Sequence, residues 1–186
     1  MAPIELFFGA LVFVFMLIGL ARGFLKELGV TTMLMFVLFF LSRFESQLQS
    51  GLTKAMGVSN RFVTVDSMDV YKCWFYLLVI VGTAFISYQG ETLAFGGELS
   101  RGPQGVFLGL LVGLVNGYLI AGSLWFYMDK THYPLAWMGF SVDKLSTLAQ
   151  NIIPYLPMSF LGKPVLFGQS LLLYFSGLLL LARVIR

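Results

Sequence analysis

Five long apolar runs divide the chain, and charged residues bound each of them. Between the flanking charges, the runs contain 16, 15, 18, 27 and 19 uncharged residues in chain order. They cover residues 6–21, 28–42, 73–90, 102–128 and 164–182. A helix of about 20 apolar residues crosses the hydrocarbon core of a bilayer. The pattern therefore predicts four or five transmembrane helices.

The first two runs are short, but their flanking residues lengthen them. Pro3 and Ile4 extend the first run, and charged side chains at the ends of the second can snorkel to the membrane surface. We interpret the pair as an antiparallel helical hairpin with spans at 4–21 and 25–43. The predicted turn contains Arg22, Gly23, Lys26 and Glu27. A re-entrant pair that does not cross the membrane completely is the competing interpretation.

The other predicted spans are 71–89, 103–128 and 164–183, and two amphipathic segments lie between spans. In residues 44–57, apolar side chains recur every four residues, which indicates a helix lying on the membrane surface or a continuation of the second span. Residues 141–153 form the second segment. Its predicted buried face consists of Leu145, Leu148 and Ile152.

Composition supports a membrane protein and not a soluble one. Of the 186 residues, 58% are hydrophobic and 11% are charged, whereas about 25% are charged in an average soluble domain. So few polar side chains cannot cover a soluble fold of this size, but a lipid bilayer favours an apolar exterior. The start of the chain also lacks the basic region of a secretory signal peptide. We predict one all-α integral membrane domain over residues 1–186, a helical bundle with short amphipathic interfacial helices.

Charge and reactive residues argue against several classes of function. The formal net charge is +3, but the twelve Lys and Arg residues are scattered between apolar runs, which does not favour nucleic-acid binding. Cys73 and His132 are each the sole residue of their type, so a metal site built from these ligands is not expected. Ser, His and acidic residues do not cluster along the sequence. We predict no catalytic site and no cofactor.

A glycine series in the fourth predicted span is the most specific pattern in the chain. Residues four apart lie on one face of a helix, so the series forms a groove that another backbone can approach closely. Its members are Gly105, Gly109, Gly113, Gly117 and Ala121. The groove predicts tight packing against another helix of this chain or of a second chain. A pore lining with space for solute is the alternative.

Asn116 lies beside this glycine face, where an amide without a partner would be costly in hydrocarbon. We therefore expect it to hydrogen-bond across a helix interface. Its predicted partners are Ser123, Ser87, Thr83, Gln169 and Ser176. We expect no Asp, Glu, Lys or Arg deep inside a span, which argues against active transport.

Two segments resemble a known family. Residues 18–28 contain Arg22-Gly23-Phe24 followed by Lys26-Glu27, and residues 99–130 contain the glycine series closed by Trp125-Phe126-Tyr127-Met128-Asp129. Both are similar, in the same order, to segments of the colicin V production (CvpA) family. Where that family has an Asp-Arg pair before its glycine helix, this chain has Glu98-Leu99-Ser100-Arg101. The fifth predicted span is also additional to the usual four.

The resemblance implies a multi-pass protein of the bacterial inner (cytoplasmic) membrane, linked to colicin V production or secretion and to envelope homeostasis, without catalytic activity. Our first hypothesis is a non-catalytic protein that acts by helix packing, as a scaffold or accessory subunit. Its expected partners are the lipid bilayer and other membrane subunits or further copies of itself. The alternative is a passive channel or small-solute exporter running beside the glycine face.

Overall fold

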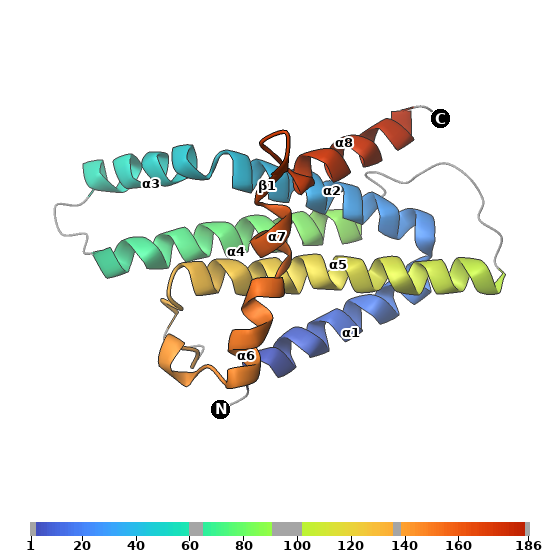
Figure 1. Cartoon of the computed structure of the whole chain (residues 1–186), viewed down its shortest axis with the longest axis horizontal. Coiled ribbons are helices and arrows are strands. Elements are labelled where there is room, and N and C mark those ends of the chain that lie inside the picture. Colours follow the sequence, from blue (N-terminus) through green and yellow to red (C-terminus); the bar gives the residue numbers. More distant parts are fainter. Residues whose placement is uncertain (1–2, 60–64, 91–101, 136–138, 185–186) are drawn as a thin grey trace.

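A computed structural model describes residues 3–59, 65–90, 102–135 and 139–184 of the chain. Over these ranges the fold is all-α apart from one two-stranded hairpin, so the all-α part of the predicted fold class is confirmed. The long helices are α1 (Ile4–Arg22), α2 (Phe24–Arg43), α3 (Glu45–Ser59), α4 (Val65–Gln89) and α5 (Pro103–Lys130). Shorter elements follow, and the chain ends in α8 (Leu171–Val184) (Figure 1).

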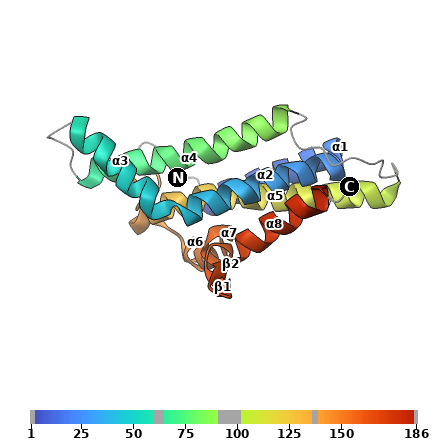
Figure 2. The same cartoon turned by 90° about the horizontal axis from the view of Figure 1, so that it is seen from above.

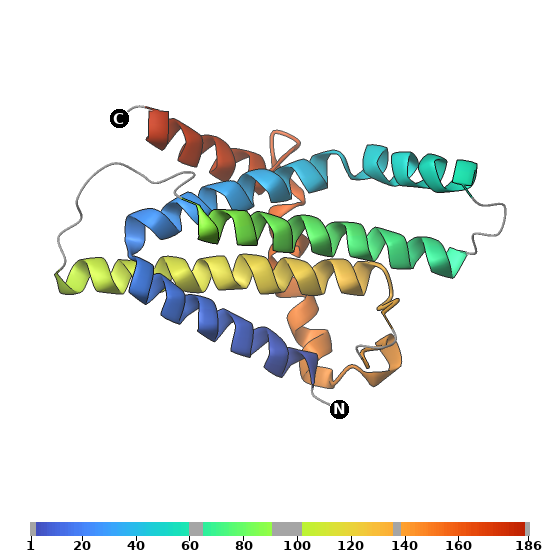
Figure 3. The ribbon, with the colours of Figure 1, turned by 180° about the vertical axis from the view of Figure 1, so that it is seen from behind.

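Within the described ranges, four helices are long and apolar enough to cross a membrane: α1, α2, α5 and residues Met68–Gln89 of α4. They stand at the first four predicted spans, with ends that differ by a few residues. These four helices lie side by side along the long axis of the molecule (Figure 3). α1 packs mainly along α5, while α2 packs against α5, α4 and α8. The first two helices therefore diverge from their junction and hold α5 between them.

The fifth predicted span, 164–183, is wrong as a single helix. Residues Pro164–Leu166 form β1 and Gln169–Ser170 form β2, an antiparallel pair, and α8 begins only at Leu171. α8 has 14 residues, which at 1.5 Å per residue extend roughly 21 Å and fall short of a bilayer core of about 30 Å. Proline and glycine interrupt the helix, because proline lacks a backbone N–H and glycine favours the turn.

Residues between α5 and α8 cross one flank of the bundle. They form η2 (Val142–Lys144), α6 (Thr147–Ile152), η3 (Ile153–Tyr155) and α7 (Pro157–Leu161). In Figure 1 these short elements run across the direction of the long helices. The amphipathic helix predicted at 141–153 is thus divided in two, and Leu148, predicted to be buried, is 58% exposed. Ala149 is the fully buried residue of α6.

The amphipathic helix predicted at 44–57 corresponds to α3. A break at Phe44 (φ −103°, ψ 16°) separates it from α2. α3 extends beyond the end of α2 and lies near the start of α4 (Figure 2). Lys130 at the end of α5 forms an ion pair with Glu45, the first residue of α3. This contact fixes the end of α5 against the α2–α3 junction.

Candidate functional site

The junction of α1 and α2 consists of one residue. Gly23 has φ 86° and ψ 160°, a conformation that a residue with a Cβ atom rarely adopts. Of the predicted turn residues, only Gly23 is outside a helix: Arg22 ends α1, while Lys26 and Glu27 lie in the first turn of α2. Lys26 is exposed, whereas the side chain of Glu27 is completely buried. The predicted turn was therefore too long, and Glu27, which it included, is a buried residue of α2.

The glycine face of α5 lies against the backbone of α1. A Cβ atom added at Gly113 would lie 2.6 Å from the carbonyl oxygen of Phe15 and 2.8 Å from Cα of Gly19. A Cβ atom at Gly109 would lie 2.7 Å from the carbonyl oxygen of Gly19. One at Gly117 would lie 2.9 Å from Cα of Val12. Real Cβ atoms do not approach other heavy atoms so closely, so these glycines are what allows α1 and α5 to touch.

The helix that packs on the glycine face belongs to the same chain. The sequence had left open whether this helix would come from the same chain or from a second one. Gly19 on α1 completes the contact: a Cβ atom there would collide with the carbonyl oxygen of Gly109. Ala121 continues the face and is 4% exposed, and Gly105 is half-buried in the first turn of α5. The groove at residues 109–117 is filled by α1.

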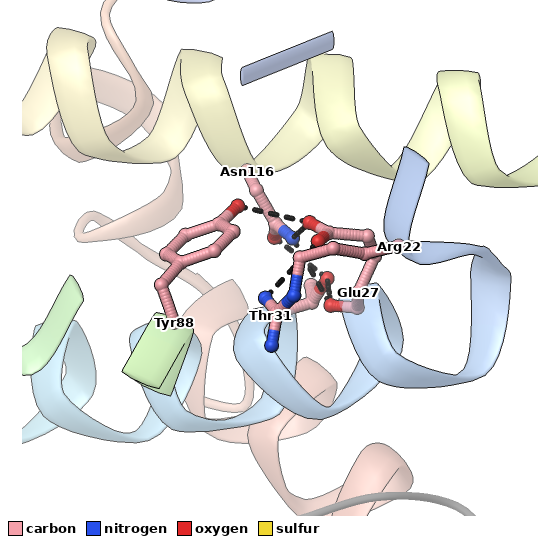
Figure 4. A network of polar contacts seen from close by, with 5 residues as sticks. All are labelled: Arg22, Glu27, Thr31, Tyr88 and Asn116. Atoms are coloured by element: carbon pink, nitrogen blue, oxygen red, sulfur yellow. Dashed lines mark hydrogen bonds and ion pairs between the residues drawn. The ribbon is translucent and has the colours of Figure 1, made fainter. Parts of the chain in front are cut away.

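Five polar residues from four helices meet inside the bundle: Arg22, Glu27, Thr31, Tyr88 and Asn116 (Figure 4). Nδ2 of Asn116 donates to Oε2 of Glu27 at 2.8 Å and to the backbone oxygen of Glu27 at 3.0 Å. The hydroxyl of Tyr88 donates to the same Oε2 at 2.9 Å. Arg22 donates to Oε1 at 3.2 Å. Each carboxylate oxygen of Glu27 therefore has at least one donor.

Thr31 and Arg22 make the remaining contacts of this cluster. The Thr31 hydroxyl lies 2.7 Å from Oδ1 of Asn116 and 3.0 Å from the carbonyl oxygen of Glu27. The guanidinium of Arg22 lies 4.7 Å from the ring centre of Tyr88, in a cation–π contact. The Arg22 side chain is 23% exposed and that of Glu27 is 0% exposed. The positive partner thus reaches the surface while the carboxylate stays inside.

We name these five residues the Glu27 cluster, and its position explains why it needs so many donors. Moving a carboxylate out of water is costly, and a buried ion pair is tolerated only where further hydrogen bonds satisfy the remaining lone pairs. Removing one partner from such a pair typically destabilises a protein by about 3–5 kcal/mol. The cluster therefore holds the ends of α1 and α2 to the middle of α5 and the last turn of α4.

The partners predicted for Asn116 were wrong. Asn116 bonds to Glu27 and Thr31 and to none of the predicted partners. Among those, Thr83 donates to the carbonyl oxygen of Val79 in its own helix. Glu27 lies in the first turn of α2 and not deep inside that span, but its side chain is completely buried among the helices, which the sequence did not indicate. Thr31 and Tyr88 were missed. The signal in the sequence was that Arg22, Glu27 and Asn116 each stand out as polar residues beside apolar runs, although at separate places along the chain.

The opposite end of the bundle is closed by aromatic and hydroxyl side chains. The rings of Tyr76 and Tyr127 stack with centres 4.1 Å apart and planes at 10°. At the start of α6, Oγ of Ser146 accepts from the backbone N–H of Ala149 at 3.0 Å and donates to Oε1 of Glu5 at 2.5 Å. Ser146 thus caps α6 and ties it to the first turn of α1.

Reactive and metal-binding residues are dispersed in the described part of the chain. Over those residues, no group of three or more His, Cys, Asp or Glu side chains could hold a metal ion. Cys73 is a buried free cysteine in α4, and His132 lies in the turn that follows α5. The Glu27 cluster and the glycine contact are therefore the candidate functional features of the described residues. Comparison with protein-family models, curated proteins and solved structures found no match.

Proposed function

We propose that this chain is a multi-pass membrane protein that acts without catalysis, as a rigid scaffold or accessory subunit for another membrane protein. The observation that carries the proposal is the Glu27 cluster, in which one set of polar contacts ties all four candidate spans together. Its donors and acceptors are directed at one another, and the glycine face is occupied by α1. Such a bundle is suited to presenting a fixed outer surface.

The outer surface of the four spans and of α8 is the part that a partner would meet. It carries large apolar side chains on separate helices, such as Phe13 on α1 (55% exposed), Phe85 on α4 (61%) and Leu178 on α8 (64%). In a bilayer these side chains contact either lipid or another apolar helix. The likeness of residues 18–28 and 99–130 to the colicin V production family supports a bacterial inner-membrane setting and a part in toxin export or envelope homeostasis.

Photo-crosslinking in native membranes tests this proposal. A photoreactive amino acid is placed at Phe13, Phe85 or Leu178, with buried Leu38 (1% exposed) as the matched control. We expect at least one outward position to form a discrete covalent product with another protein or a second copy, while Leu38 forms none. Lipid adducts alone at all three positions, together with a lone monomer after extraction in mild detergent, would refute the scaffold.

A second candidate function is passage of an ion or small solute, and the observation in its favour is Glu27 itself. Ionisable residues between membrane helices are rare and often mark ion or proton paths. The path would run through the Glu27 cluster, since α1 fills the glycine face. Purified protein in liposomes should then conduct or exchange solute, and Glu27→Gln, which keeps the side-chain shape, should abolish this flux. Liposomes with wild-type protein that remain tight would remove this candidate.

A further inference from the structure

The tip of the β1–β2 hairpin combines two unfavourable features in one residue. Leu166 pairs with Gln169, so Phe167 and Gly168 are the two turn residues. Their φ angles are 49° and 73°, as in a type I′ turn, which normally takes Asn-Gly. Phenylalanine adopts a positive φ only with strain. Phe167 is also 95% exposed, the largest exposed fraction among the large hydrophobic residues that the structure describes.

Neither feature helps the hairpin to fold. Asparagine at this position would suit the turn better, and a polar side chain would be better solvated in water. A bulky apolar side chain that is fully exposed is instead what insertion into an apolar environment requires. Val165, two residues earlier, is 60% exposed, so the apolar surface extends along β1.

The hairpin stands beside the end of a candidate span. Just before it, Gly162 lies against Ser42, the next-to-last residue of α2: a Cβ atom at Gly162 would be 3.4 Å from the Ser42 hydroxyl oxygen. Below the hairpin, α7 packs on α5 where Pro157 meets Gly122. Figure 2 shows the hairpin projecting from the flank of the bundle, and Figure 1 shows it near the α3 end of α2. The hairpin therefore lies at the same level along the bundle as the polar end of α2.

After the hairpin, α8 returns along α2 with an apolar outer surface. Leu178, Leu181 and Val184 are 64%, 60% and 79% exposed, while Leu172 and Ser176 are buried on the inner side. The hairpin tip and α8 therefore both carry exposed apolar side chains, and in the proposed membrane protein we assign both to the surface that faces lipid. Lys163, immediately before β1, is exposed and carries a positive charge at the base of the hairpin.

We propose that the β1–β2 hairpin is a membrane anchor, with Phe167 inserted at the boundary between the headgroups and acyl chains and Lys163 at the level of the lipid phosphates. This depth suits the backbone, because the open edges of a two-stranded hairpin need water or headgroups and are not tolerated in the hydrocarbon core. Aromatic side chains favour this boundary, and lysine favours anionic headgroups. The anchor fixes the start of α8. The proposal rests on the membrane insertion of the four spans.

Spin labels attached to single cysteines test the depth of the hairpin in vesicles of neutral and anionic phospholipid. Cys73→Ala removes the one native cysteine, and labels are placed at Phe167, at Leu17 on the outer face of α1, and at Gln47 on α3. Collisions with oxygen report acyl chains, and collisions with a water-soluble nickel chelate report water. We expect the oxygen-to-nickel ratio at Phe167 to be several-fold above that at Gln47 and below that at Leu17.

The controls separate this proposal from the one on which it rests. A water-like ratio at both Leu17 and Phe167 would refute membrane insertion of the bundle. A lipid-like ratio at Leu17 with a water-like ratio at Phe167 would refute the anchor alone. Protection of Phe167 from both reagents would also refute the anchor, because it would mean that a protein covers the tip.

A second measurement keeps the native tip and tests the phenylalanine itself. With the label at Val165, Phe167→Asn should lower the oxygen-to-nickel ratio toward the Gln47 value, because the anchoring side chain is gone. The unfolding temperature in detergent should not fall, since Asn-Gly suits the turn. An unchanged ratio at Val165 in this variant would show that Phe167 is not the anchor and would overturn the proposal.

Discussion

A methyl group at Gly19 should force α1 away from α5. In Gly19→Ala, the new Cβ atom would lie 2.6 Å from Cα and 2.9 Å from N of Gly113, in addition to its collision with Gly109. All three are backbone atoms, so no side chain can rotate to make room. Gly9 provides the matched control on the same helix, because a Cβ atom there would meet nothing within 4 Å.

The expected cost follows from these distances. Ordinary carbon contacts are about 3.5–4.0 Å, so the helices must separate locally by roughly 1 Å. A gap of this size loses about a quarter to a half of the dispersion energy of the contacts that it opens. Overpacking usually costs about 1–3 kcal/mol, and we place Gly19→Ala near 3 kcal/mol because only backbone can yield. Gly9→Ala should be neutral or stabilising by up to about 1 kcal/mol, since alanine favours the helix.

The free energy of unfolding can be measured in mild detergent by titration with a denaturing detergent, with helix content followed by circular dichroism. Both alanine variants and wild type are compared under identical conditions. Equal free energies of unfolding for Gly19→Ala and Gly9→Ala would refute the close backbone contact. The larger change Gly113→Ile should prevent the α1–α5 contact altogether, and a wild-type unfolding curve for it would lead to the same conclusion.

Two further variants test other polar contacts. Asn116→Leu removes two hydrogen bonds to Glu27, one of them to its buried carboxylate, and should lower the free energy of unfolding by about 2–4 kcal/mol; a loss within error of zero would contradict the Glu27 cluster. Ser146→Ala removes the cap of α6 and should destabilise that helix by about 0.5–2 kcal/mol, seen as faster hydrogen exchange at the Ala149 amide. Thr147→Ala is the control, and equal exchange in the two variants would rule out the cap.

Hydropathy located the long helices because four of the apolar runs are interrupted only at their ends. It failed at residues 164–170 because the count of uncharged residues treats Pro164, Gly168 and leucine alike, although the first two disfavour a helix. As a result, one span was predicted where the structure has a hairpin and a short helix. Backbone preference, and not polarity, decides the structure there.

The glycine face was visible in the sequence, since spacing by four residues identifies one side of a helix. The identity of its partner was not, because Gly19 and its neighbours in α1 have no comparable series. Glu27 was assigned to a turn because charged residues were taken as the ends of spans. Finding Asn116 opposite Glu27 needs the path of the chain between α2 and α5, and no local pattern contains that information.

The separation of the Glu27 cluster along the chain has a consequence for biosynthesis. Asn116 follows Glu27 by 89 residues and Tyr88 follows it by 61. At roughly 5–20 residues per second, a ribosome needs about 4–18 s to make the chain from Glu27 to Asn116. The charged partner Arg22 is made before Glu27, but the donors of Tyr88 and Asn116 come later. In the proposed membrane protein, the emerging α1–α2 pair must therefore wait at the translocon, or at the lipid surface, with the Glu27 carboxylate short of these hydrogen-bond donors until α4 and α5 arrive.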